Sequence, residues 1–129
     1  MSRASVAGCV VVLLTACTNT PSASSSKTYA VAYRLTASAG VTFDSVKYED
    51  AHGLFVTVVA PQPGWATGFS ANTGSYVRAT AWVLSSGSGA SVALRVLWTE
   101  SGVSTSSDSS TAVTAAPGRF TLDIPRRQI

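Results

Sequence analysis

Cysteine, histidine and charged residues are scarce in this chain of 129 residues, and their scarcity limits the chemistry it can support. Both cysteines, Cys9 and Cys17, lie near the N-terminus, so the long remainder of the chain cannot form a disulfide. Charged residues make up 12% of the chain and the net charge is +3. Lys and Arg are scattered, apart from Arg126 and Arg127, whereas nucleic-acid binding needs clustered basic residues. We therefore expect no nucleic-acid partner.

Residues that favour helices are also sparse. Lys, Glu, Gln and Met are uncommon, whereas Val, Thr, Ser, Ala and Gly dominate. Branched side chains fit a pleated sheet, and Ser and Gly favour turns. The longest apolar run, residues 6–14, is too short to span a bilayer, which needs about 20 residues. Its length instead suits the central part of a signal peptide.

The N-terminus has the order of features expected of an exported lipoprotein. Arg3 provides a positive charge before the apolar run, which ends in Leu14-Thr15-Ala16-Cys17. This ending resembles the bacterial lipobox, and the resemblance implies cleavage between Ala16 and Cys17, with fatty acids such as palmitate attached at Cys17. The alternative is a secreted protein in which Cys17 has no such role.

These features divide the chain into three parts. Residues 1–16 are expected to be a lipoprotein signal peptide, residues 17–27 a lipidated cysteine with a flexible polar tether, and residues 28–129 a folded domain. An acylated protein of this kind is held at a membrane by its buried acyl chains. We expect an extracytoplasmic protein, lipid-anchored in the cell membrane or the outer membrane.

Alternation of apolar and polar residues predicts an all-β domain after the tether. Seven or eight strands at spacings of about ten residues favour an immunoglobulin-like antiparallel β-sandwich, with a small closed barrel as the alternative. A phase slip predicts a bulge near Asp44 and Ser45. Residues 54–59 read as a buried strand, 103–107 as a polar edge strand, and the last strand as ending before Pro125.

Aromatic residues on the predicted strand 76–84 provide a candidate binding face. Tyr76, Arg78 and Trp82 alternate with small apolar residues, so they share one side of the strand. This side could be a platform for a sugar or acyl chain, or the rim of a partner interface. Packing in the core is the simpler interpretation, as it is for Trp98 on a later strand.

Catalytic and metal-binding patterns are weak. His52 next to Glu49 and Asp50 is a poor ligand set for a transition metal, and Asp44 with these two acids lacks the spacing of a regular calcium loop. No G-x-S-x-G motif occurs. We therefore predict no enzyme activity, no metal site and no cofactor, and interpret these residues as ordinary turn residues.

Several short blocks carry a family resemblance. They are YRLTA at 33–37, VKYED at 46–50, PGW at 63–65, YVRATA at 76–81 and SVALRVLW at 91–98. Together they resemble the soluble domain of the mycobacterial small membrane proteins (the MmpS family), which accompany large lipid transporters, and related small bacterial lipoproteins. The resemblance implies an immunoglobulin-like sandwich and a place beside a transporter. The chain departs from that family in having a lipobox instead of a membrane-spanning helix, and in lacking a cysteine pair.

Two functions fit these expectations. The first is a non-catalytic, membrane-anchored envelope lipoprotein whose sandwich binds an envelope protein partner, with a transport complex as one candidate. The alternative is a glycan- or lipid-binding module that uses the aromatic face of Tyr76, Arg78 and Trp82.

Overall fold

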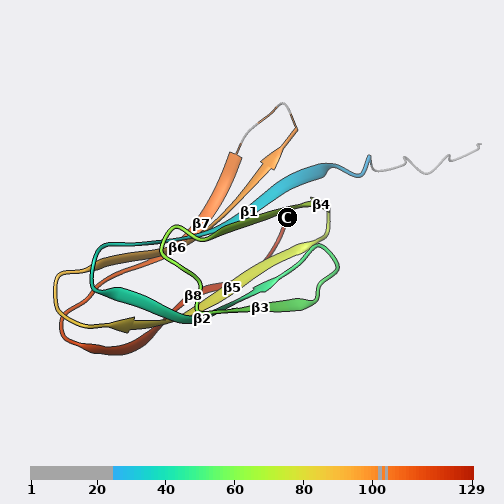
Figure 1. The fold of residues 1–129 in the computed structure, drawn as a ribbon. Coiled ribbons are helices and arrows are strands. Elements are labelled where there is room, and N and C mark those ends of the chain that lie inside the picture. The colour runs from blue at the N-terminus through green and yellow to red at the C-terminus, as the bar shows by residue number, and fades with distance from the viewer. Residues whose placement is uncertain (1–24, 102, 104) are drawn as a thin grey trace, which may run out of the picture.

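The protein is a sandwich of two antiparallel sheets (Figure 1). The computed structural model describes residues 25–101, 103 and 105–129. Within these residues the chain forms eight strands and no helix, so it has no helix that could cross a membrane. The strands are β1 Thr28–Ala37, β2 Val41–Glu49, β3 Phe55–Val59, β4 Ala66–Asn72, β5 Tyr76–Ser85, β6 Ser91–Glu100, β7 Thr105–Val113 and β8 Gly118–Gln128.

Each sheet contains four strands. One sheet has the order β4-β1-β6-β7 and the other has the order β3-β2-β5-β8. Only the β2–β3 and β6–β7 connections join neighbouring strands of one sheet, so every other connection between consecutive strands passes from one layer to the other. The predicted all-β antiparallel sandwich is confirmed, as is the bulge, because the β2–β5 register shifts between Phe43 and Ser45.

The core lies between the two sheets and consists mainly of aliphatic side chains. Leu35, Leu94, Val96 and Ile124 are fully buried, and they come from both layers. Each lies in a strand where buried and exposed residues alternate, which is the pattern of a sheet with one face on the core and the other exposed to solvent. Burial of these apolar side chains is the main favourable contribution to folding.

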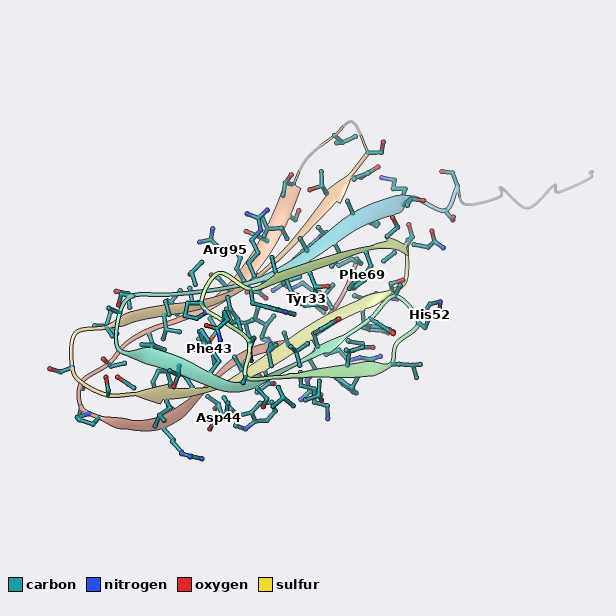
Figure 2. All side chains as sticks on the ribbon, viewed as in Figure 1. Tyr33, Phe43, Asp44, His52, Phe69 and Arg95 are labelled. Atoms are coloured by element: carbon teal, nitrogen blue, oxygen red, sulfur yellow. The ribbon has the colours of Figure 1, made fainter. Side chains whose placement is uncertain are left out.

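An aromatic cluster joins the two sheets within the sandwich. The ring of Tyr33 lies 5.1 Å from that of Tyr48 and 5.9 Å from that of Phe69, and Tyr48 lies 5.8 Å from Trp65. Figure 2 shows Tyr33 and Phe69 in the space between the layers. Tyr33 is completely buried, so its hydroxyl needs partners inside the protein.

Two local predictions were wrong, and a third was confirmed in part. The strand at 54–59 is not buried, because β3 is an edge strand whose residues Phe55 and Val59 are exposed. The last strand does not end before Pro125, since β8 continues to Gln128. Proline is tolerated there because β8 is an edge strand, where a missing N–H need not face a neighbour. The predicted core packing of Trp98 is confirmed in part, because its side chain is partly buried against the core.

Candidate interaction surface

The outer face of the β3-β2-β5-β8 sheet contains a shallow groove of about 250 Å³. Three neighbouring strands form it, and the residues are brought together by the sheet register, in which Lys47 on β2 lies opposite Thr80 on β5. We refer to the β3-β2-β5-β8 sheet as sheet B and name this surface the sheet-B groove. Its lining residues are Lys47, Phe55, Arg78, Thr80 and Trp82.

The sheet-B groove combines aromatic rings with positive charge. The Lys47 ammonium lies 4.6 Å from the centre of the Phe55 ring, and the Arg78 guanidinium lies 5.8 Å from it. These distances permit cation–π attraction. Among the described residues, neither cation forms an ion pair. The nearby acid, Asp123, accepts a hydrogen bond from Thr80. The groove therefore offers stacking surfaces beside two cations that form no ion pair in the part of the chain that the structure describes.

Exposed apolar side chains gather around the same groove. Leu54 is 64% exposed, Phe55 48%, Val59 78% and Trp82 38%. The first three lie on or beside β3, an edge strand that pairs with β2 alone. An edge strand presents unpaired backbone N–H and C=O groups to which another chain can add. This corner of the molecule thus has the composition and the open hydrogen-bonding edge of an interaction surface.

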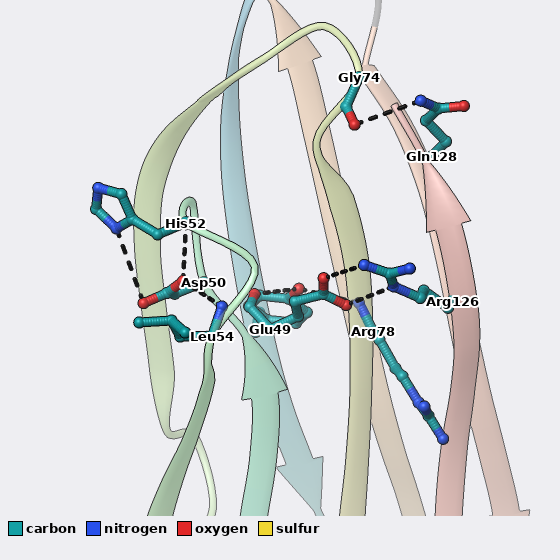
Figure 3. A network of polar contacts seen from close by, with 9 residues as sticks. Glu49, Asp50, His52, Leu54, Gly74, Arg78, Arg126 and Gln128 are labelled. Atoms are coloured by element: carbon teal, nitrogen blue, oxygen red, sulfur yellow. Dashed lines mark hydrogen bonds and ion pairs between the residues drawn. The ribbon is translucent and has the colours of Figure 1, made fainter.

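A buried carboxylate lies next to this surface, at the end of β2. Glu49 is 1% exposed, and its two oxygens accept hydrogen bonds from Arg126 at 2.7 and 3.0 Å (Figure 3). The Arg126 guanidinium also lies 3.7 Å from the centre of the Tyr76 ring. Hydrogen bonding to Glu49 raises the pKa of Arg126, so the guanidinium stays charged. This bidentate pair joins β2 to β8, and it leaves neither the Glu49 carboxylate nor the Arg126 guanidinium without a partner.

Tyr33 stabilises the backbone beneath the groove. Its hydroxyl donates to the Glu49 carbonyl oxygen at 2.9 Å and accepts from the Arg78 N–H at 3.2 Å. Arg78 lies where the β5–β8 register shifts, between Val77 and Ala79, so it has no strand partner on β8. Burial raises the pKa of Tyr33 to about 12. The phenol therefore remains neutral. Its hydroxyl provides the hydrogen-bond partner for the backbone N–H at this bulge, from which the Arg78 side chain points outward.

The turn between β2 and β3 is stabilised by hydrogen bonds to the side chain of Asp50, which lies within it. One oxygen of Asp50 accepts hydrogen bonds from the Leu54 and His52 backbone N–H groups, at 2.9 and 2.8 Å. These bonds lower the pKa of the Asp50 carboxyl. Gly53 has a φ of 75°, a left-handed conformation that glycine adopts without strain. The turn thereby fixes where β3 begins.

The predicted candidate face is divided by the structure. Arg78 and Trp82 line the groove, and Trp82 is partly exposed, so the core-packing interpretation of this face was wrong. Tyr76 instead lines a separate recess with Arg126. Sequence reasoning missed Lys47 and Phe55, since only the pairing of β2 with both β3 and β5 places them beside Arg78.

The other residues considered earlier are dispersed. Asp44 pairs with Arg119 at 3.3 Å, whereas Glu49 and Asp50 have the partners given above. Across 25–101, 103 and 105–129, no three His, Cys, Asp or Glu residues gather in a way that could hold a metal ion. The expected cleavage and lipidation residues, Ala16 and Cys17, lie outside the described residues.

Comparisons with known proteins identify no relative of this chain. The chain matches no protein-family model, no curated protein and no solved structure. The resemblance to the mycobacterial small membrane proteins therefore remains a prediction that rests on the short sequence blocks alone. What is established is the fold, a two-layer antiparallel β-sandwich with a cationic, aromatic groove beside an exposed edge strand.

Proposed function

We propose that the protein is a non-catalytic envelope lipoprotein, anchored through Cys17, whose sandwich binds a protein partner along β3 and the sheet-B groove. The observation that carries this proposal is the concentration of exposed apolar side chains at β3, next to the cations Lys47 and Arg78 of the groove. Large apolar side chains that remain exposed together are typical of interaction sites. The open edge of β3 can also pair with an extended segment of the partner.

The charge pattern indicates the kind of partner. A segment that adds to β3 as a strand would place alternate side chains on the outer face of the sheet. Acidic residues there would pair with Lys47 and Arg78, whose charged groups lie close to the Phe55 ring on β3, and apolar residues would cover Phe55. The proposed partner is therefore an envelope protein with an extended segment that alternates acidic and apolar residues.

The anchor is tested separately from the binding surface. We expect mass spectrometry of the mature protein to find residues 1–16 removed and acyl groups on Cys17, and Cys17→Ala to abolish this modification and membrane retention. An unmodified thiol at Cys17 with residues 1–16 retained would contradict the anchored role. It would leave the binding surface to be judged by its own experiment.

The binding surface is tested with two valines on opposite edges of the molecule. Val59 on β3 is 78% exposed and Val113 on β7 is 70% exposed, and both lie on edge strands. A photo-crosslinking residue placed at either site should capture an envelope protein only from the β3 position. Val59→Asp should remove the binding of that protein, whereas Val113→Asp should not. Equal capture at both sites, or binding unaffected by Val59→Asp, would contradict the proposal.

A glycan- or lipid-binding module is the second candidate, favoured by the groove itself. Trp82 and Phe55 provide stacking surfaces and Arg78 provides a cation, in a space of about 250 Å³. This function predicts that Trp82→Ala removes binding to a glycan or lipid array, while Val59→Asp has little effect. The protein-partner function predicts the larger effect for Val59→Asp, so the pair of variants distinguishes the two.

A further inference from the structure

The outer face of the other sheet carries two arginines at directly opposed positions. Arg34 on β1 is the register partner of Arg95 on β6, and both side chains are exposed. The same row continues to Ala66 on β4 and Ser109 on β7, and both of these side chains are small. Figure 2 shows Arg95 on the outer side of the sheet, away from the facing layer.

No carboxylate among the described residues compensates this arginine pair. Four of the six acidic side chains pair with other cations: Asp44 with Arg119, Glu49 with Arg126, Glu100 with Lys27 and Asp108 with Arg127. Of the other two, Asp50 accepts hydrogen bonds from its own turn and Asp123 accepts one from Thr80, and neither forms an ion pair with Arg34 or Arg95. Like charges directly opposed on neighbouring strands repel each other. The arrangement is unfavourable for the protein alone and becomes favourable once an anion lies between the two side chains.

A recess of about 170 Å³ opens at the pair, lined by Arg34, Thr36, Ala93, Arg95 and Leu97. A guanidinium donates two parallel hydrogen bonds to an oxyanion, and a tetrahedral dianion has enough oxygens to accept from two guanidiniums. A single carboxylate would neutralise only one of the two. We infer that Arg34 and Arg95 form a binding site for a phosphate-class oxyanion, with the Thr36 hydroxyl as a further donor.

The surroundings of the recess leave room for a larger molecule that carries the phosphate. A second, larger recess of about 630 Å³ shares Thr36 and Ala93 with the first and extends along the same face. Serine hydroxyls and small apolar side chains line it, among them Ser38, Ser91 and Val92. Both free phosphate and a phosphate monoester on a lipid are compatible with this site. The site lies on the opposite sheet from the sheet-B groove, so it is independent of the proposed function.

The site is tested by calorimetric titration of the full protein, in neutral detergent, with inorganic phosphate at about pH 8 and constant ionic strength. We expect saturable binding that weakens at least tenfold in Arg34→Gln and in Arg95→Gln. Arg119→Gln removes the same charge from a residue paired with Asp44, and should bind like the wild type. No saturable binding by the wild type, or an equal loss in Arg119→Gln, would overturn the site.

Two further measurements complete the test. Urea unfolding of the Arg34 and Arg95 variants should show no loss of stability, so that lost binding cannot be attributed to unfolding. Titration with neutral micelles, with and without phosphatidic acid, distinguishes the two sources of phosphate. If the micelles release binding heat only when they contain phosphatidic acid, and only when both arginines are present, the phosphate belongs to a lipid. If the protein binds inorganic phosphate but not these micelles, the ligand is soluble.

Discussion

Removal of the Tyr33 hydroxyl should destabilise the sandwich more than the loss of one oxygen atom suggests. The hydroxyl is the hydrogen-bond partner of both the Glu49 carbonyl and the Arg78 N–H, in a side chain that is completely buried. Tyr33→Phe keeps the ring and its packing but leaves both backbone groups without a partner. Each orphaned group costs about 1–3 kcal/mol, and the contact with Arg78 is only part-buried. We expect a loss of about 2–4 kcal/mol in the free energy of unfolding.

Urea denaturation followed by tryptophan fluorescence measures this loss. A change of that size lowers the urea midpoint by roughly 1–3 M in a domain of this size. Tyr48→Phe is the matched control, because Tyr48 packs against Tyr33 but its hydroxyl makes no hydrogen bond among the described residues. It should lose less than about 0.5 kcal/mol. If Tyr33→Phe and Tyr48→Phe lower the free energy of unfolding equally, the Tyr33 hydroxyl does not stabilise the bulge and the reasoning is wrong.

The same residue should make the protein sensitive to alkali. The pKa of Tyr33 is raised by burial to about 12, above its ordinary value of 10.0. The unfolded chain therefore loses this proton first as the pH rises. The stability provided by the neutral phenol is fully present below pH 10 and is lost between about pH 10 and pH 12. The difference in urea midpoint between wild type and Tyr33→Phe should narrow over that range.

Three further stability predictions follow from burial and charge, each measured by urea unfolding. Leu94→Ala should lower the free energy of unfolding by about 2–5 kcal/mol, since Leu94 is fully buried, whereas Leu54→Ala should change it by less than about 0.5 kcal/mol. Arg126→Gln should destabilise more than Arg119→Gln, because only the former leaves a buried carboxylate unpaired; equal effects would contradict this. Arg95→Gln should raise stability by about 0.2–1 kcal/mol at low salt and by less at high salt, in the absence of phosphate.

Local alternation of residues was enough to predict the fold class. Strands β1, β5 and β6 each have a buried face of consecutive alternate residues, and a two-residue period can be recognised in the sequence without knowledge of the partners. The bulge at Asp44 and Ser45 was also predictable, since a phase slip in one strand marks it. The resemblance to a lipobox is carried by a linear run of residues, so the predicted role of Cys17 depends on no folded context.

The tertiary structure alone decided which strands are neighbours and which faces meet solvent. Residues 54–59 are apolar enough to be buried, yet β3 lies at an edge and exposes Phe55 and Val59. The groove likewise depends on β2 lying between β3 and β5, which places Lys47 beside Arg78. Strand order depends on contacts between residues far apart in the chain, and alternation within one strand carries no information about them. The sequence by itself therefore determined that the strands each have one buried face, whereas the pairing of the strands determined the sheets and the surfaces.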